Sequence, residues 1–399
     1  MSPILMLVAL NLGGAGVELG GGLLNERMVL SAQPWVSIRY SVAEISIGPK
    51  LNFDLRDGQL RQQDWDEPGD YGLIVHKFSW GKWLRGGAIA HKSFGNGTLV
   101  NRYHNRVDRD HGRLGLELKI LTEKQRFWRP NRYELMVDQV LDSPVMAGGF
   151  GWWSKNGELN VLYAADHAAP TQIEPAVQAD GWLKHSPRSR WALGLSSRWQ
   201  LIPRGGQMEL AFIGDINTIR TRGWGIHSGL EIAFQDRDDW RVQLRVLGMR
   251  SGRDYTWSLF DTSYLIDRWR GIESELENAD AVWGLQGLFQ LTVQKALIIG
   301  FEYTDVEQSD RTDFGAWMRI PLDRFTLGAF WKVRRVNGFL ETFDWDKLLA
   351  ALSGRYRVNH WFTVTGVLSR DWFVDRDNAT YAPRTTALIM AGFDWINPR

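Results

Sequence analysis

Apolar and polar residues alternate along most of the chain. The segment Leu114–Ile120 places Leu or Ile at every second position, and Phe325–Val333 repeats the alternation with larger apolar residues. Successive side chains of a strand point to opposite faces, so each such segment has one apolar and one polar face. Roughly sixteen to twenty segments of about 9–12 residues follow one another, which is the length that a tilted strand needs to cross a bilayer. The pattern therefore predicts an all-β protein made of membrane-spanning strands.

Aromatic residues stand at the ends of many of these segments. Trp199, Trp240, Trp331, Trp361 and Trp395 are examples. An aromatic ring with a polar N–H or O–H suits the boundary between lipid and water, and aromatic girdles flank the apolar band of membrane barrels. The aromatic positions thus favour a membrane barrel over a soluble sheet protein.

The connections between the segments fall into two length classes. Short polar connections occur at 235–239, 293–295 and 321–323. Short turns at one end and long loops at the other are typical of outer-membrane barrels. The stretches that we expect to be long loops are Gly58–Gly69, Gly95–Arg113, His167–Ser189, Ser251–Asp280 and Arg370–Arg384. Within one of them, Tyr264–Asn278 has apolar residues at helical spacing, and it is either a helix that caps the barrel or docks a partner, or a loop with a partly buried face.

Two soluble architectures compete with this interpretation. A β-sandwich usually has shorter strands, and a chain of 399 residues would form several such domains joined by a linker, which the sequence lacks. A β-propeller would show a repeat of about 40–50 residues, and none is found. A closed barrel also leaves no strand edge exposed.

Composition narrows the chemistry. The chain has 47 Lys and Arg against 46 Asp and Glu, a net charge of +1, so bulk electrostatic binding to nucleic acid is not expected. It has no Cys, which excludes disulfides, a thiolate nucleophile and Cys-ligated metal centres. No apolar run reaches the roughly 18 residues of a membrane-spanning helix.

The first residues predict a separate segment. Residues 1–22 contain the apolar run Ile4–Leu12 followed by small residues, which is typical of a secretory signal peptide. No Lys or Arg precedes Arg27, so the usual positive start is missing, and a buried N-terminal strand or a mis-assigned start codon is the alternative. The predicted organisation is a signal peptide at 1–22, a short segment at 23–33 and a barrel at 34–396.

In this pattern the chain resembles Gram-negative outer-membrane β-barrel proteins of the porin-like size class. The resemblance covers about 34–395 and rests on alternation, aromatic ends and connection lengths rather than on a diagnostic motif. It implies a single antiparallel barrel of about 18 strands (16–20) in the bacterial outer membrane, with short periplasmic turns and long extracellular loops. The implied partners are outer-membrane lipid and lipopolysaccharide, the barrel-assembly machinery, and either further copies of the chain or envelope-complex proteins. The last strand, Thr386–Trp395, is followed by four residues, whereas such barrels usually end on an aromatic residue.

The segment Gly95–Arg113 carries the densest functional residues. A long, charged segment of this kind has three interpretations: a loop folded into the lumen that sets selectivity, a rim loop that contacts lipopolysaccharide phosphates, or an internally paired charge network. Asp108, Asp110 and His111 include a fragment of a calcium loop, but the Gly and distal Glu of an EF-hand are absent, so no metal site is expected. The candidate binding residues are Arg102, Tyr103, His104, Arg106, Asp108, Arg109, Asp110 and Arg113.

Basic residues on the polar face of the strands are the second functional signal. In a barrel they point into the lumen, where they either create a field across a water-filled pore or close it through salt bridges. A barrel of 16 or more strands is too wide for side chains alone to fill. The lumen-facing candidates are Arg198, Arg241, Arg245, Lys332, Arg334, Arg355 and Arg357.

These features predict a porin-like passive channel for small polar or anionic solutes. The alternative is a structural barrel that anchors a multiprotein envelope complex for polymer export, adhesion or gliding. No nucleophile elbow, zinc-protease or P-loop motif occurs, so we expect neither an enzyme, with no catalytic residues to name, nor a cofactor.

Overall fold

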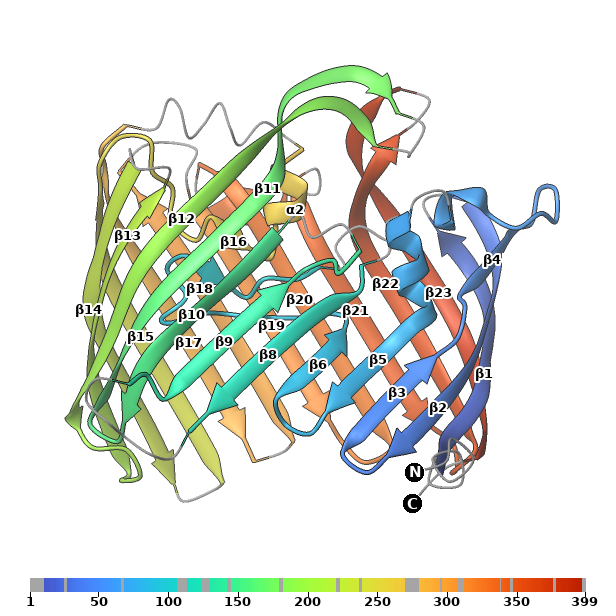
Figure 1. Ribbon diagram of the computed structural model, residues 1–399, viewed down its shortest axis with the longest axis horizontal. Coiled ribbons are helices and arrows are strands. Elements are labelled where there is room, and N and C mark those ends of the chain that lie inside the picture. Colours follow the sequence, from blue (N-terminus) through green and yellow to red (C-terminus); the bar gives the residue numbers. More distant parts are fainter. Residues whose placement is uncertain are drawn as a thin grey trace.

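The computed structural model shows a β-barrel in side view (Figure 1). The structure describes residues 11–24, 27–65, 68–105, 113–122, 129–141, 145–178, 182–219, 223–236, 239–269, 280–294, 296–307, 312–337, 339–344, 347–375 and 378–396. Short turns join the strands at one end, which we call the short-turn end, and longer segments join them at the other, the long-loop end.

Nearly all regular structure in the described residues is strand. The helical elements are η1 (Gln62–Asp64), η2 (Pro68–Ile74), α2 (Tyr264–Asp267) and η3 (Phe339–Phe343). The strands are β1 (Asn11–Leu24), β2 (Arg27–Tyr40), β3 (Ala43–Ile47), β4 (Leu51–Asp54), β5 (Val75–Trp80), β6 (Leu84–Gly87), β7 (Val100–Asn101), β8 (Gly115–Leu121), β9 (Arg132–Val137), β10 (Val145–Ser154), β11 (Gly157–Val177), β12 (Leu183–Ile202), β13 (Met208–Ile219), β14 (Gly223–Asp236), β15 (Trp240–Ser251), β16 (Phe260–Asp261), β17 (Trp283–Val293), β18 (Leu297–Val306), β19 (Thr312–Pro321), β20 (Phe325–Val336), β21 (Leu348–Arg357), β22 (Phe362–Asp375) and β23 (Thr380–Ile396).

The main sheet closes on itself. It contains 21 of these strands, and β3 and β4 both pair with β2 as one interrupted strand, so the described residues form a wall of 20 antiparallel strands. Each strand pairs with the next along the chain, and the ring closes where β1 pairs with β23. The predicted fold is confirmed, and closure leaves the wall without an edge.

The outer face of the barrel is apolar. Leu193, Leu195, Leu230 and Leu244 are each more than 40% exposed and alternate with buried or polar neighbours. In water such a surface would be very unfavourable, whereas a bilayer matches it. Exposed Trp residues flank the band at both ends. Trp224 and Trp283 lie where strands begin at the long-loop end, and Trp199, Trp240, Trp361 and Trp395 are among those toward the short-turn end.

The wall begins earlier than the sequence predicts. Strand β1 occupies Asn11–Leu24, which overlaps most of the segment expected to be a signal peptide, and β2 begins at Arg27 rather than at 34. Residues Ala15–Leu23 pair with β23 and most of β1 pairs with β2, so a cleavage at 22 would remove most of the strand that closes the ring. The structure thus places a strand in this segment, as the alternative of an N-terminal strand expects, while the signal peptide itself stays a prediction. The sequence did not indicate this strand clearly, because a Gly-rich strand lacks clear alternation.

Two predicted loops are largely strand. The stretch His167–Ser189 continues β11 and β12 beyond the neighbouring strands, and Arg370–Arg384 continues β22 and β23. Figure 1 shows the long hairpin of β11 and β12 bending across the long-loop end toward β22 and β23, and we call it the arch. At its tip, Trp182 stacks on Trp269 with 4.9 Å between ring centroids.

The stretch with helical spacing, Tyr264–Asn278, is described only in part. In residues 264–269 the structure has one turn of helix, α2 (Tyr264–Asp267), whose four residues are all buried, and residues 270–279 lie outside the described part. The choice between a helix and a loop for the whole stretch therefore falls outside the described residues. No helix in the described ranges has the length and hydropathy needed to span a membrane.

Candidate functional site: a divided lumen

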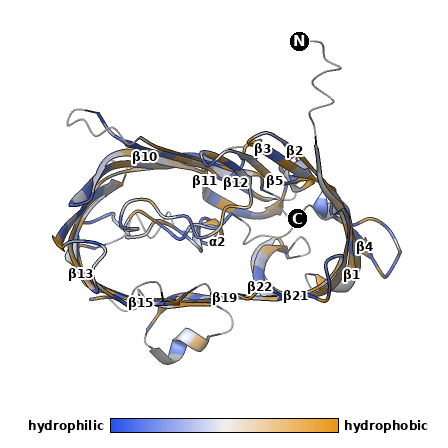
Figure 2. Ribbon diagram, turned by 90° about the horizontal axis from the view of Figure 1, so that it is seen from below, coloured by the Kyte–Doolittle hydropathy of each residue, from blue (hydrophilic) through white to orange (hydrophobic). Residues whose placement is uncertain are grey.

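Two chain segments enter the barrel and pack together. Residues 88–105 follow β6, residues 252–269 follow β15, and Figure 2 shows the segment with α2 inside the oval outline of the wall. Their short strands β7 and β16 pair in parallel, and the backbone N–H of Ser258 donates to the carbonyl of Thr98 at 2.9 Å. We call the two segments together the lumen insert.

The lumen insert has its own apolar core. Phe94, Leu99, Tyr255, Phe260 and Tyr264 are each about 1% exposed or less and belong to one cluster. Most wall residues of the cluster come from β9 to β15, and Val306 of β18, Leu349 of β21 and Trp372 of β22 also belong to it, so the insert packs mainly, but not solely, against the β9 to β15 side of the barrel. Burial of several large side chains makes it a packed body rather than a loose loop.

Polar contacts hold the lumen insert to the wall. The Asn96 amide donates to Asp215 Oδ1 on β13 at 2.9 Å, and Arg245 of β15 donates to the Asn96 carbonyl at 2.7 Å. Near the long-loop end, the hydroxyl of Tyr103 in the insert donates to Asp138 Oδ2 at 3.2 Å. Arg113, which precedes β8, pairs with the same carboxylate at 2.6 Å, and the Arg and Asp side chains are 7% and 0% exposed. Buried pairs of this kind are costly to break, because removal of one partner leaves an uncompensated charge.

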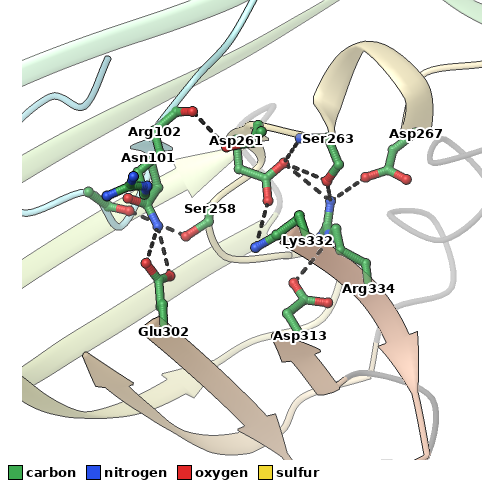
Figure 3. A network of polar contacts seen from close by, with 12 residues as sticks. Asn101, Arg102, Ser258, Asp261, Ser263, Asp267, Glu302, Asp313, Lys332 and Arg334 are labelled. Atoms are coloured by element: carbon green, nitrogen blue, oxygen red, sulfur yellow. Dashed lines mark hydrogen bonds and ion pairs between the residues drawn. The ribbon is translucent and has the colours of Figure 1, made fainter. Parts of the chain in front are cut away.

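Asp261 of the lumen insert is held by two wall cations. Lys332 Nζ lies 3.3 Å and Arg334 NH1 3.7 Å from its carboxylate, and Arg334 also pairs with Asp267 at 2.5 Å (Figure 3). Burial alone would raise the pKa of Asp261, but the two cations and the Ser263 hydrogen bonds hold that pKa below its usual value. The carboxylate is therefore charged at neutral pH.

The rest of the lumen is open. A cavity of about 1150 Å³ is lined by β1–β3, β5 and β17–β23 on the wall and by the lumen insert on the other side. Its lining combines cations, imidazoles and aromatic rings. The residues that matter below are Glu18, Trp35, Lys50, His76, His91, Arg102, His104, Arg113, Trp317, Arg319, Phe330, Arg355 and Asp394.

Arg102 faces this cavity from the lumen insert. Its guanidinium carbon lies 3.4 Å from the ring centroid of Trp317, a cation–π contact of the order of 0.5–2 kcal/mol. Burial lowers the pKa of Arg102 to about 10, and Glu302 opposes this change, so the group remains a cation at neutral pH. Its backbone has a positive φ of 51°, and that of His91 has 56°. For residues other than Gly this conformation costs of the order of 1 kcal/mol and is concentrated at functional sites.

The imidazoles beside Arg102 are close to one another. The rings of His91 and His104 lie 5.9 Å apart, and both lie within 6.4 Å of the Phe330 ring. Burial lowers the pKa of His91 to about 4, and the Arg102 cation contributes to that change. His91 is thus neutral near pH 7 and offers a polar N–H without a charge.

The structure divides the predicted residues of Gly95–Arg113. The described part lies in the lumen, as one of the three interpretations predicts, and it brings Arg102, His104 and Arg113 to the cavity. Tyr103 is wrong as a binding candidate, because it is fully buried and its hydroxyl donates to Asp138 Oδ2 at 3.2 Å. Arg106, Asp108, Arg109, Asp110 and His111 lie outside the described residues.

Most of the predicted wall cations serve the structure of the lumen. Arg198 pairs with Glu231 at 2.5 Å and Arg241 with Glu209 at 2.8 Å, while Lys332, Arg334 and Arg245 hold the lumen insert. Each of these five cations thus has a partner on the wall or in the insert, so none of them is a free cation for a solute. Arg355 alone of the seven lines the open cavity, and Arg357 is exposed at the end of β21.

Sequence reasoning missed Arg319, Trp317, Phe330 and His91 as site residues. Arg319 and Trp317 stand at alternate positions of β19, the same periodic signal that singled out Arg355. His91 lies just before the segment Gly95–Arg113, and its position depends on a ring contact with Phe330, which is far away in the sequence. Only the folded chain reveals that contact.

Comparisons with known proteins give limited similarity. No protein-family model and no curated protein matches the chain. Among solved structures, OccK11 (OpdR) of Pseudomonas aeruginosa is 8% identical with a TM-score of 0.36, covering 96% of this chain and 95% of that one. OprD of the same organism is 7% identical with a TM-score of 0.35, covering 97% of this chain and 94% of that one. OccK2 (OpdF) of the same organism, solved in complex with glucuronate, is 8% identical with a TM-score of 0.35, covering 97% of this chain and 95% of that one. The barrel described above is established by its own strand pairing.

Proposed function

We propose that the chain is a passive channel of a bacterial outer membrane that passes small polar and anionic solutes through the open half of its lumen. An antiparallel barrel with an outward apolar band and Trp at both ends is the architecture of that membrane. Outer-membrane lipid then surrounds the wall, and insertion by the barrel-assembly machinery follows from the same placement.

One observation carries the anion preference. Arg102, Arg319 and Arg355 all line the open cavity, and none of them makes an ion pair within the described part of the chain. Arg102 stacks on Trp317, and Arg319 lies two residues further along β19 toward the short-turn end. Arg319 is opposite Gly328 of β20, and Arg355 of β21 is opposite Thr326, two residues nearer that end. Same-face neighbours on a strand are about 7 Å apart, so the three cations form a descending series. A solute carboxylate or phosphate passes from one to the next.

Carboxylates on nearby strands also line the cavity. Asp394 is on β23, two strands from β21, and Glu18 is on β1, the next strand round the ring. Lumen charges of both signs create a local field, which orients a polar solute as it passes.

The test is conductance of the purified, folded protein in a planar bilayer under a salt gradient. Stable openings with anion preference are expected, and Arg319→Glu with Arg355→Glu should move the reversal potential toward cation preference. Arg241→Gln is the matched control, because Arg241 already pairs with Glu209. No openings from protein shown to be folded by its heat-modifiable mobility would refute the channel.

A second candidate function, an anchoring barrel for an envelope complex, is favoured by the arch. β11 and β12 span 21 and 20 residues, about twice the length of β10, and extend beyond the wall. Such a projection suits contact with another protein. Silent but folded protein that co-purifies with a partner, and loses it when the arch is shortened, would support this function.

A further inference from the structure

Arg102 lies close to a carboxylate that it does not bind. Arg102, Glu302 and Trp317 line one crevice of about 20 Å³, and the charge of Glu302 raises the pKa of Arg102 against the effect of burial. An Arg and a Glu in such a setting ordinarily form a bidentate ion pair. The described structure contains no such pair, so other contacts must keep the two groups apart.

Two side-chain amides donate hydrogen bonds to the carboxylate of Glu302. The Asn101 amide donates to both carboxylate oxygens, at 2.8 and 3.0 Å, and the Gln286 amide donates to Oε1 at 2.7 Å. Figure 3 shows the two Asn101 contacts beside Arg102. Glu302 is 5% exposed, and these three hydrogen bonds satisfy it without a cation.

An aromatic ring holds Arg102 instead. The Trp317 ring lies flat over Gly300, where a Cβ would come within 2.3 Å of the ring carbon Cζ2, and the guanidinium stacks on it. The backbone of Arg102 is fixed on both sides, because its N–H donates to Ser93 Oγ at 2.8 Å and its carbonyl accepts from Thr262 Oγ1 at 2.7 Å. Stacking uses one face of the guanidinium and leaves its in-plane N–H groups for another acceptor.

We propose that Asn101, Gln286 and Trp317 are positioning residues that keep the Arg102 guanidinium out of an ion pair with Glu302, so that it binds the oxyanion of a passing solute. The ligand class is a small carboxylate or phosphate, which accepts two N–H groups of one guanidinium edge. This inference rests on the proposed function, since it assigns the contact that selects the solute.

The decisive experiment pairs two variants. Asn101→Ala frees an oxygen of Glu302, which then forms an ion pair with Arg102. The chloride-to-potassium permeability ratio of the channel should therefore fall several-fold, and Arg102→Gln should lower it to a similar extent. Adding Glu302→Gln to Asn101→Ala removes the competing charge and should restore the ratio. A merely structural Asn101 would not be rescued in this way. An unchanged ratio in Asn101→Ala, or no recovery in the double variant, would overturn the proposal.

Substitutions of Trp317 give a second test of the positioning role. Trp317→Phe keeps an aromatic face and should keep the permeability ratio, whereas Trp317→Ala should lower it. Trp331→Phe is the control, because Trp331 lies on the neighbouring strand and donates to the Thr342 carbonyl instead. Equal ratios for Trp317→Phe and Trp317→Ala would contradict the positioning role.

Binding in detergent separates this inference from the channel itself. Calorimetric titration with inorganic phosphate should show affinity lost in Asn101→Ala and regained in the double variant, whether or not the protein conducts. Conduction without this pattern refutes the positioning, and the pattern without conduction refutes the channel.

Discussion

The two halves of the lumen use the same kind of residue in opposite ways. On the side of β9 to β15, lumen-facing cations such as Arg198 and Arg245 are paired or hold the lumen insert. On the side of β19 to β21, Lys332 and Arg334 also hold the insert, whereas Arg319 and Arg355 face an open cavity without an ion pair among the described residues. A lumen cation is therefore available to a solute only where no insert carboxylate or wall carboxylate reaches it.

This difference has a physical cause. A barrel of 20 strands encloses more space than its own side chains fill, and the lumen insert brings an apolar core that fills one half. Buried charges in that half must be neutralised, whereas the charges of the open half remain hydrated. The charges that stabilise the insert and the cations that face the cavity without an ion pair thus lie mainly in different halves.

The largest expected effect comes from removal of the first segment of the insert. Lys92 and Tyr103 exchange both backbone hydrogen bonds, at 3.0 and 2.8 Å, so an Asn-Gly turn can replace Ser93–Arg102. The single-channel conductance should rise several-fold, because the filled half becomes open. An unchanged conductance from folded protein would show that the insert does not limit passage.

Loss of one insert anchor should affect stability more than loss of an open-half cation. Asp138→Ala removes the buried carboxylate that pairs with Arg113 and accepts from Tyr103 of the insert, and we expect the free energy of unfolding to fall by about 3–5 kcal/mol. Arg355→Ala, in the open half, should change it by less than about 0.5 kcal/mol. Urea unfolding in lipid vesicles, followed by Trp fluorescence, measures both, and similar values for the two variants would contradict the division.

The smallest expected effect is a response to acid at Asp261. Its pKa lies below the usual 3.8, so the stabilisation by Lys332 and Arg334 is complete above that value and is lost as the pH falls through the lower folded-state pKa. Channel recordings between pH about 5 and about 2.5 should show the insert loosening, as noisier current, only at the acid end. Asp261→Asn should show noisy current already at neutral pH. Equal noise in both proteins at neutral pH would contradict the anchoring role.

The fold was readable from the chain because alternation is a local signal. Leu114–Ile120 and Phe325–Val333 predict their strands, and the predicted strand number of about 18 agrees with the 20 found. The sequence did not reveal β1, because Gly16, Gly20 and Gly22 leave Glu18 as a single polar residue among the alternate positions. It did not reveal the arch, because polar residues there suggest a loop, whereas pairing between the two strands keeps them extended.

The candidate site was only partly readable. The sequence identified the charged segment after β6 and the basic face of β21, and thereby Arg102, His104 and Arg355. It did not distinguish these from Tyr103, in the same segment, or from Arg241, which has the same charge and strand periodicity as Arg355; these two are engaged by Asp138 and Glu209. Periodicity reports which face a side chain takes, not which partner meets it there.

The sequence by itself determined a closed, membrane-spanning barrel with a charged lumen, because a two-residue period separates lipid-facing from lumen-facing side chains. Only the tertiary structure decided which half of that lumen is filled and which cations remain open. Asn96 meets Asp215 across 119 positions and Asn101 meets Glu302 across 201, and such contacts depend on how the inserted segments pack. Hydrogen bonds to buried carboxylates are made between specific partners in space, and no local pattern of residues specifies them.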